Sequence, residues 1–120
     1  GMWNLSVSSN VDSLNVAYAQ GGLTGDWFHG AYFLQVAYLQ LAMDCDASAL
    51  GAHFQDIALA DPDTFFGHLE AAVRVPAHEM VETRDWESAA SFSLETYYNG
   101  SESSVWDAAP WTRIYENFLR

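Results

Sequence analysis

The four histidines of the chain are the residues best suited to hold a metal ion or a small cofactor. One falls on each of four successive expected helices: His29, His53, His68 and His78. In helical bundles, metal ligands come from facing helices, each of which projects one or two side chains inward. An acidic residue lies within about one helical turn of three of these histidines, namely Asp26, Asp56 and Glu82. Such a carboxylate can act as a further ligand or orient the imidazole.

The spacing of these histidines is not specific for metal binding. The Glu-x-x-His pairs of di-iron bundles are absent, and Asp26-x-x-His29 is the nearest approach to one. The stretch from His78 to Glu82 keeps half of the zinc-binding pattern His-Glu-x-x-His, with Glu82 in place of the second histidine. A histidine on an apolar helix face is commonly a hydrogen-bonded core residue. We therefore expect no cofactor and keep a metal ion, held by the four histidines, as the alternative.

Residues for nucleophilic catalysis are poorly placed. Cys45, the only cysteine, stands between Asp44 and Asp46, whose negative charges disfavour a reactive thiolate. No serine occupies a Gly-x-Ser-x-Gly turn, and the glycine-rich stretch 21–25 lacks the lysine and the spacing of a phosphate-binding loop. The sequence therefore favours a protein that is not an enzyme.

The charge balance points to the type of partner. Sixteen acidic residues face four arginines and no lysine, which gives a formal net charge of −12. Binding to a nucleic-acid backbone needs clustered cations, so nucleic acid is excluded as the expected partner. A chain depleted in cations favours a basic protein partner, because complementary electrostatic fields speed association.

Aromatic residues provide candidates for an interface. The chain has five tryptophans, and four lie outside its most apolar stretch: Trp3, Trp86, Trp106 and Trp111. Tryptophan is enriched at the energetically dominant positions of protein interfaces. Core packing is the competing explanation for each of them. We predict that these four residues contribute to binding a basic partner or to self-association, with a homodimer as one form.

The element expected to organise the fold is a helix over residues 26–43. Between Trp27 and Met43 its only polar side chains are His29, Gln35 and Gln40, so nearly all of its faces must be covered. His29 and Gln40 share one face at about 100° per residue, which makes that face the first place to look for a ligand. The run is at the short limit for a membrane span, and its flanking aspartates argue against one.

Helix start and stop signals divide the rest of the chain. Asp26 is expected to cap the central helix, and Pro76 is expected to end one helix and begin another. Beyond Pro76 the apolar face shifts, so either the helix kinks or a new one begins at Asp85. The remaining helices are expected over 11–20 (capped by Asn10), 47–60 (capped by Asp46), 62–75, 86–98 and from Pro110 onward.

Two segments leave an alternative open. Residues 3–9 alternate apolar and polar side chains, and residues 91–98 do the same, which suits short β-strands. The favoured fold is nonetheless all-α, with about five or six helices around the buried helix 26–43. The alternative is α+β with strands near 3–9 and 91–98.

The expected organisation is one domain over residues 1–120, with Gly1 typical of a residue left after tag removal. The lone cysteine and the lack of a signal sequence favour the cytoplasm. The favoured function is a small acidic, non-catalytic interaction domain, of an adaptor, chaperone-like or inhibitor-like type. It would bind a basic partner or itself, and neither nucleic acid nor a membrane.

Overall fold

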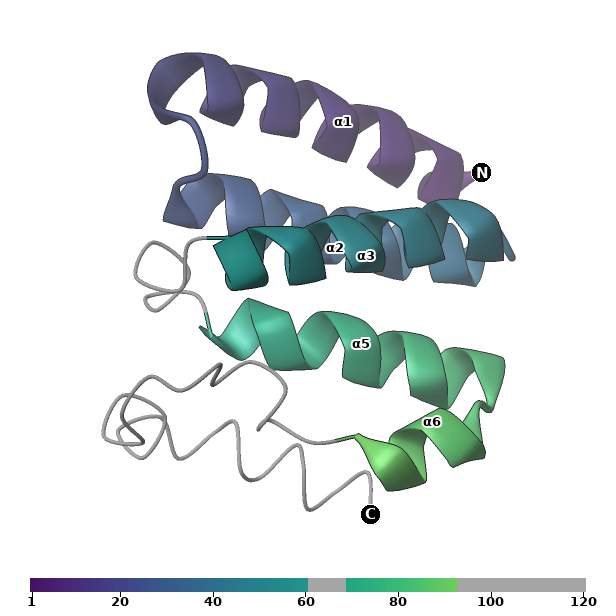
Figure 1. Cartoon of the computed structure of the whole chain (residues 1–120). Helices are drawn as coiled ribbons and strands as arrows, with labels where there is room; N and C mark the ends of the chain where they lie inside the picture. The colour runs from purple at the N-terminus through teal and green to yellow at the C-terminus, as the bar shows by residue number, and fades with distance from the viewer. Residues whose placement is uncertain (61–68, 93–120) are drawn as a thin grey trace. The chain divides into compact units, whose positions relative to one another are not determined.

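The computed structural model describes residues 1–60 and 69–92, which form five α-helices. These are α1 (Met2–Gly21), α2 (Gly25–Gln40), α3 (Asp44–Ala60), α5 (Leu69–Thr83) and α6 (Trp86–Ser91), as shown in Figure 1. The same residues contain no β-strand, which confirms the all-α class for this part of the chain. None of the described helices is long and apolar enough to cross a membrane.

The chain divides into two compact units, Gly1–His53 and Phe54–Arg120. We call them the N-terminal unit and the C-terminal unit and describe each by itself. The N-terminal unit contains α1, α2 and the first part of α3. The C-terminal unit contains the last turns of α3 together with α5 and α6. Whether residues 1–120 behave as one domain stays a prediction.

Helix α1 corrects the expectation for the start of the chain. Residues 3–9 are helical, not a strand, and Asn10 lies inside the helix instead of capping it. Polar side chains that favour turns are bonded here to the helix's own backbone: Asn10 Nδ2 donates to the Ser6 carbonyl at 2.8 Å, and Ser8 Oγ donates to the Leu5 carbonyl at 3.1 Å. These local bonds allow serine and asparagine to remain within a helix.

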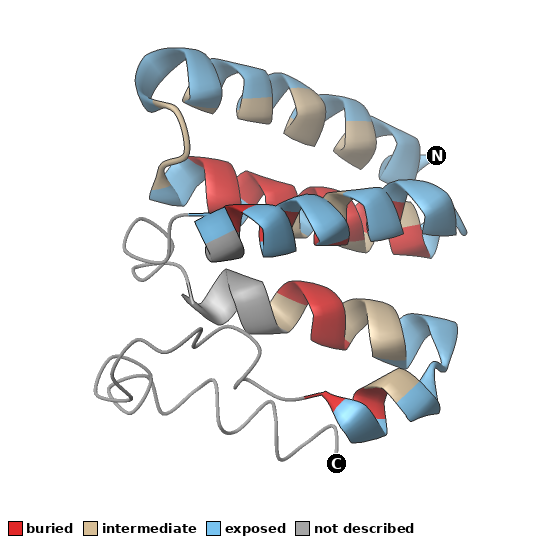
Figure 2. Cartoon of the chain, viewed as in Figure 1, coloured by how far each residue is buried: buried red, intermediate tan, exposed pale blue. Residues whose placement is uncertain are grey.

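One side of α1 packs along α2. The half-buried residues of α1 recur at helical spacing: Ser6, Val7, Asn10, Val11, Leu14 and Ala17. No residue of α1 is fully buried, and most of its remaining surface is exposed (Figure 2). The alternation of residues 3–9 was misleading because the relevant pattern extends over the whole helix and includes polar residues on the packed side.

The turn between α1 and α2 depends on Gly22. Its φ of 74° lies in the left-handed region, where a side chain would be strained, and its N–H donates to the Tyr18 carbonyl at 2.8 Å. Thr24 is the N-cap of α2, so Asp26 is not the cap that the sequence predicts. Asp26 lies in the first turn instead, where a carboxylate stabilises the positive end of the helix dipole.

Helix α2 carries eight buried residues: Trp27, Phe28, Gly30, Ala31, Leu34, Gln35, Ala37 and Leu39. They are the red positions on the ribbon of α2 in Figure 2. Asp26, His29, Phe33 and Gln40 are exposed and fall within one narrow sector of the helix. The shared face of His29 and Gln40 is therefore the open side of α2, which differs from the prediction that nearly all faces of this helix are covered.

Helix α2 ends three residues before the predicted boundary. Ala42 has a φ of 55°, its N–H donates to the Leu39 carbonyl, and the N–H of Met43 donates to the Tyr38 carbonyl. This is a Schellman motif with alanine at the position that glycine usually occupies. Helix α3 then begins at Asp44, so Asp46 lies in its first turn and is not its cap.

Helix α5 corrects the role of Pro76. The helix runs from Leu69 to Thr83 with Pro76 inside it, so the proline neither ends one helix nor begins another. An internal proline removes one backbone hydrogen bond at a cost of about 3 kcal/mol. Val75, Pro76 and Ala77 are all buried, and burial of their apolar surface offsets this cost. The helix predicted over 62–75 lies outside the described residues up to position 68.

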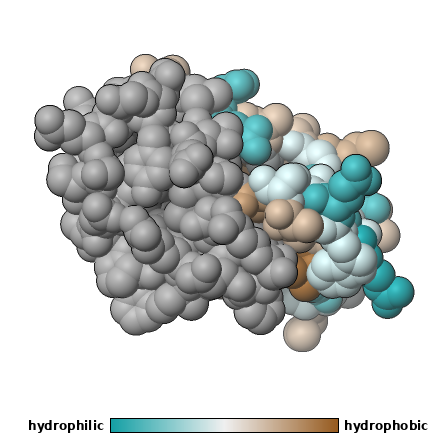
Figure 3. Space-filling model, turned by 60° about the horizontal axis from the view of Figure 1, so that its bottom comes forward, coloured by the Kyte–Doolittle hydropathy of each residue, from teal (hydrophilic) through white to brown (hydrophobic). Residues whose placement is uncertain are grey.

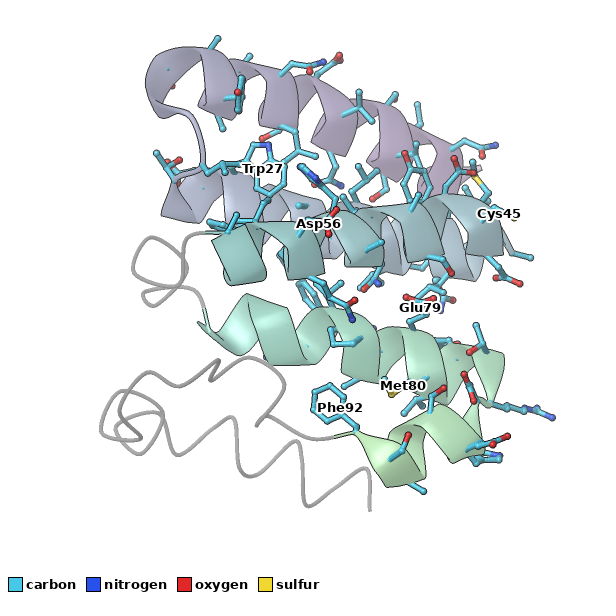
Figure 4. All side chains as sticks on the ribbon, in the orientation of Figure 1. Trp27, Cys45, Asp56, Glu79, Met80 and Phe92 are labelled. Atoms are coloured by element: carbon cyan, nitrogen blue, oxygen red, sulfur yellow. The ribbon has the colours of Figure 1, made fainter. Side chains whose placement is uncertain are left out.

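Helix α6 decides between the two alternatives for the chain beyond Pro76: a new helix follows Asp85. The Asp85 carboxylate caps it by accepting a hydrogen bond from the Ser88 N–H at 3.1 Å. Arg84, with a φ of 58°, forms the turn between the two helices. Phe92 follows α6, is buried, and points back toward α5 in Figure 4. The alternative strand 91–98 is helical at Ser91, and residues 93–98 and the helix from Pro110 lie outside the described residues.

Candidate functional site

The structure places His29 and His53 on different sides of α2. The His29 ring is exposed and lies 4.9 Å from the ring of Phe33, measured between centroids. His53, at the end of the N-terminal unit, is also exposed and lies 5.8 Å from the ring of Trp27, which is labelled in Figure 4. Residues 27 and 29 are about 200° apart around a helix axis. The rings of His53 and His29 therefore contact aromatic side chains on nearly opposite faces of α2.

The other two candidate ligands lie outside the N-terminal unit. His78 is half-buried in α5 of the C-terminal unit, and His68 lies outside the described residues. Within residues 1–60 and 69–92, no three histidine, cysteine or acidic side chains come together as a metal-binding group. The hypothesis of a metal held by all four histidines stays a prediction.

The two candidate interface tryptophans within the described residues are exposed to solvent. Trp3 is 42 % exposed near the start of α1, and Trp86 is 60 % exposed at the start of α6. Trp106 and Trp111 lie outside the described residues. In the view of Figure 3, described hydrophilic side chains lie beside apolar ones. Exposure makes the first two tryptophans accessible to a partner, and their role at an interface stays a prediction.

A pocket of about 320 Å³ opens between α1 and α2, entirely within the N-terminal unit. The side that α1 provides consists of Asn10, Ser13, Val16, Ala17 and Gln20. The side that α2 provides consists of Asp26, His29, Gly30 and Phe33. The open face of α2 on which His29 lies is thus one wall of this pocket.

Small residues form the pocket where the two helices approach each other. A Cβ atom added to Gly30 would lie 3.4 Å from Leu14 Cδ2 and 4.0 Å from Ser13 Oγ. Leu14 thus rests almost directly on the backbone of α2. The adjacent Ser13 and Ala17 are too short to fill the space beside this contact, which leaves the hollow.

The pocket presents hydrogen-bond acceptors. Asn10 uses its Nδ2 group to donate to Ser6, at 2.8 Å to the carbonyl and 3.3 Å to the hydroxyl, which leaves its Oδ1 atom available. Asp26 adds a carboxylate, and Ser13 adds a hydroxyl that can accept or donate. Phe33, 45 % exposed, adds an aromatic ring. Asn10 and Ser13 were not predicted as site residues, because the sequence pattern does not show that they face His29.

No lysine or arginine balances Asp26 within its own unit. The N-terminal unit has four aspartates, at positions 12, 26, 44 and 46. The first arginine of the chain, Arg74, belongs to the C-terminal unit. Four negative side chains against no lysine or arginine give a formal charge of −4. One electrostatic effect is visible at the end of α2: burial raises the pKa of Tyr38, and the Asp46 carboxylate raises it further.

Gln35 is the one fully buried polar side chain of α2. It has no exposed surface, and neither its Nε2 nor its Oε1 atom has a hydrogen-bond partner among the described residues. Buried polar groups are nearly always hydrogen-bonded, so Gln35 is a cost to stability. It does not line the pocket between α1 and α2.

No protein-family model, curated protein or solved structure matches this chain.

Proposed function

We propose that this protein is a non-catalytic interaction domain that binds a basic protein partner. The observation that carries the proposal is that the N-terminal unit combines uncompensated negative charge with exposed apolar side chains. This unit has no lysine or arginine. It also exposes seven large apolar side chains: Met2, Trp3, Leu5, Val16, Tyr18, Phe33 and Met43.

Helix α1 is the main source of this exposed surface. Leu5 is 71 % exposed and Tyr18 is 62 % exposed, and the helix carries a single charged residue, Asp12. Interfaces between proteins combine apolar and aromatic anchors with a polar rim, and complementary charge accelerates the encounter. Apolar side chains beside carboxylates suit a partner surface that presents lysine and arginine, whose aliphatic stems pack on apolar groups.

Two further points belong to the proposal. We place α2 at the centre of the packing, which is supported by its eight buried residues against none in α1. We place the protein in the cytoplasm, which is supported by its exposed free thiol at Cys45, near the start of α3 in Figure 4. A reducing compartment keeps such a thiol from oxidising.

The experiment is a comparison of labelled peptides of equal length that are basic, neutral or acidic, titrated with the full chain by fluorescence anisotropy. We expect only the basic peptides to bind, and their affinity to fall between about 0.1 M and about 1 M salt, where the Debye length shrinks from about 10 Å to about 3 Å. Equal binding of all three peptides, or none, would overturn the proposal. Light scattering on the same samples tests self-association. A dimer that does not bind basic peptides would also overturn the proposed function.

A further inference from the structure

We infer that the pocket between α1 and α2 receives an arginine side chain of the basic partner. This inference rests on the proposed function and adds the site and the chemical group that is recognised. The pocket has a volume of about 320 Å³ and is built from two helices of the same unit. A hollow of this size accepts one long side chain, and not an extended segment.

The polar groups of the pocket match a cation that only donates hydrogen bonds. Arginine presents five N–H donors and has no acceptor. Facing them are the Asp26 carboxylate and the Asn10 Oδ1 atom, whose amide nitrogen is already occupied by Ser6. Gln20, at the same rim, has a second amide oxygen to offer. The two helices thus supply acceptors from opposite walls.

The charge of the pocket also favours an arginine side chain as its ligand. Asp26 has no lysine or arginine in its unit to pair with, so its negative charge remains available to a ligand. An anionic ligand would meet this carboxylate without any compensating lysine or arginine, and a neutral ligand would leave it unpaired.

The aromatic wall distinguishes arginine from lysine. The ring of Phe33 is 45 % exposed at the pocket, and the His29 ring meets it at an interplanar angle of 71°. A guanidinium group is planar, more weakly hydrated than an ammonium, and stacks on aromatic faces. Between a carboxylate and an aromatic ring, arginine therefore gains two interactions, whereas lysine gains mainly the charge.

The test uses the full chain and three labelled peptides that differ only in one residue type. The first alternates arginine with glycine, the second has lysine for arginine, and the third has citrulline, the neutral analogue of arginine. We expect the arginine peptide to bind more tightly than the lysine peptide and the citrulline peptide not to bind. In competition, N-acetyl-arginine amide should displace the arginine peptide, because it carries the guanidinium group and blocks both backbone charges as a peptide does.

Two substitutions that each remove one negative charge distinguish binding in the pocket from attraction by the overall negative charge of the unit. Asp26→Asn removes the carboxylate of the pocket and should weaken the arginine peptide about three- to tenfold. Asp12→Asn removes the same charge from an exposed position of α1 outside the pocket, and it should leave the affinity nearly unchanged at about 0.15 M salt. Phe33→Leu should cost about two- to fivefold for arginine and less for lysine.

A neutral variant tests the cavity itself. Ser13→Leu places an apolar side chain into the hollow without changing the charge, and position 13 is exposed, so the fold should persist. Circular dichroism and thermal melting check that each variant is folded. The expected result is loss of arginine-peptide binding by folded Ser13→Leu.

The outcomes separate the two proposals. Equal losses for Asp26→Asn and Asp12→Asn, or full binding by Ser13→Leu, would overturn the arginine pocket and leave the basic-partner function standing. Binding of free L-arginine as tightly as the peptide would also overturn it, in favour of an amino-acid site. Failure of both cationic peptides to bind the unmodified chain would overturn the pocket and the proposed function together.

Discussion

Leu14 of α1 lies against the backbone of α2 at Gly30, where an added Cβ atom would stand 3.4 Å from Leu14 Cδ2. This distance is an ordinary van der Waals contact for one methyl group and leaves no room for more. The contact determines how closely the two helices approach and therefore the width of the pocket beside it.

The first prediction concerns this contact. Gly30→Ala should raise the free energy of unfolding by up to about 1 kcal/mol, because alanine restricts the unfolded chain and suits a helix interior. Gly30→Leu should lower it by about 1–3 kcal/mol, because the larger side chain forces α1 away from α2. Urea denaturation followed by circular dichroism measures both. A Gly30→Leu protein as stable as the unmodified chain would show that the helices are not in this contact.

The second prediction concerns the buried amide of Gln35. Gln35→Leu should stabilise the protein by about 1–3 kcal/mol, because it removes two polar atoms that are buried without hydrogen bonds. Gln40→Leu is the matched control on the same helix. Gln40 is exposed, so this change should stay within about 0.5 kcal/mol. Equal effects of the two substitutions in chemical denaturation would contradict the burial of Gln35.

The third prediction concerns the two left-handed residues that end α2 and α5. Ala42→Gly and Arg84→Gly should each stabilise by about 1 kcal/mol, because φ values of 55° and 58° strain a residue with a side chain. Ala52→Gly, at an exposed helical position of α3, should instead destabilise by about 0.5–1 kcal/mol. The opposite signs, measured by urea denaturation, distinguish the conformational effect from a general response to glycine.

The fourth prediction concerns the cap of α6. Hydrogen bonds from Ser88 lower the pKa of Asp85 below its usual value of 3.8. A carboxyl whose pKa is lower in the folded state stabilises the fold fully above the unfolded pKa and loses this contribution as the pH falls through the folded value. Asp85→Asn keeps a capping oxygen but cannot ionise. The unmodified chain should therefore be more stable than Asp85→Asn at neutral pH, and the difference should shrink below about pH 4. A difference that is constant with pH would contradict the ionised cap.

Some features of this protein follow from the sequence alone. The apolar stretch after Asp26 forms a helix with a largely buried surface, and Gly22 ends the helix before it. Asp85 caps a new helix, which is one of the two alternatives that the shifted apolar face left open. His29 and Gln40 share one face of α2, as their spacing predicts, but that face is exposed, whereas the apolar composition of the helix predicts cover on nearly all faces. These features depend on local chemistry, namely side-chain periodicity, a capping carboxylate and the backbone freedom of glycine.

Other features were decided by tertiary packing. Pro76 remains inside α5, where Val75 and Ala77 are buried around it, although its local preference is to end a helix. Residues 3–9 are helical although their apolar and polar side chains alternate, and only Ser6 and Val7 among them lie on the half-buried side of α1, a pattern that cannot be seen in seven residues.

The candidate site shows the same division most clearly. The sequence alone identified His29, and the structure added Asn10 and Ser13, which the sequence placed at the cap and in the body of a helix over 11–20 but not beside His29. A pocket between two helices depends on how closely they approach, and the contact of Leu14 with Gly30 sets that distance. Local periodicity carries no information on which residue of one helix meets which residue of another, because that pairing is decided by side-chain size and packing.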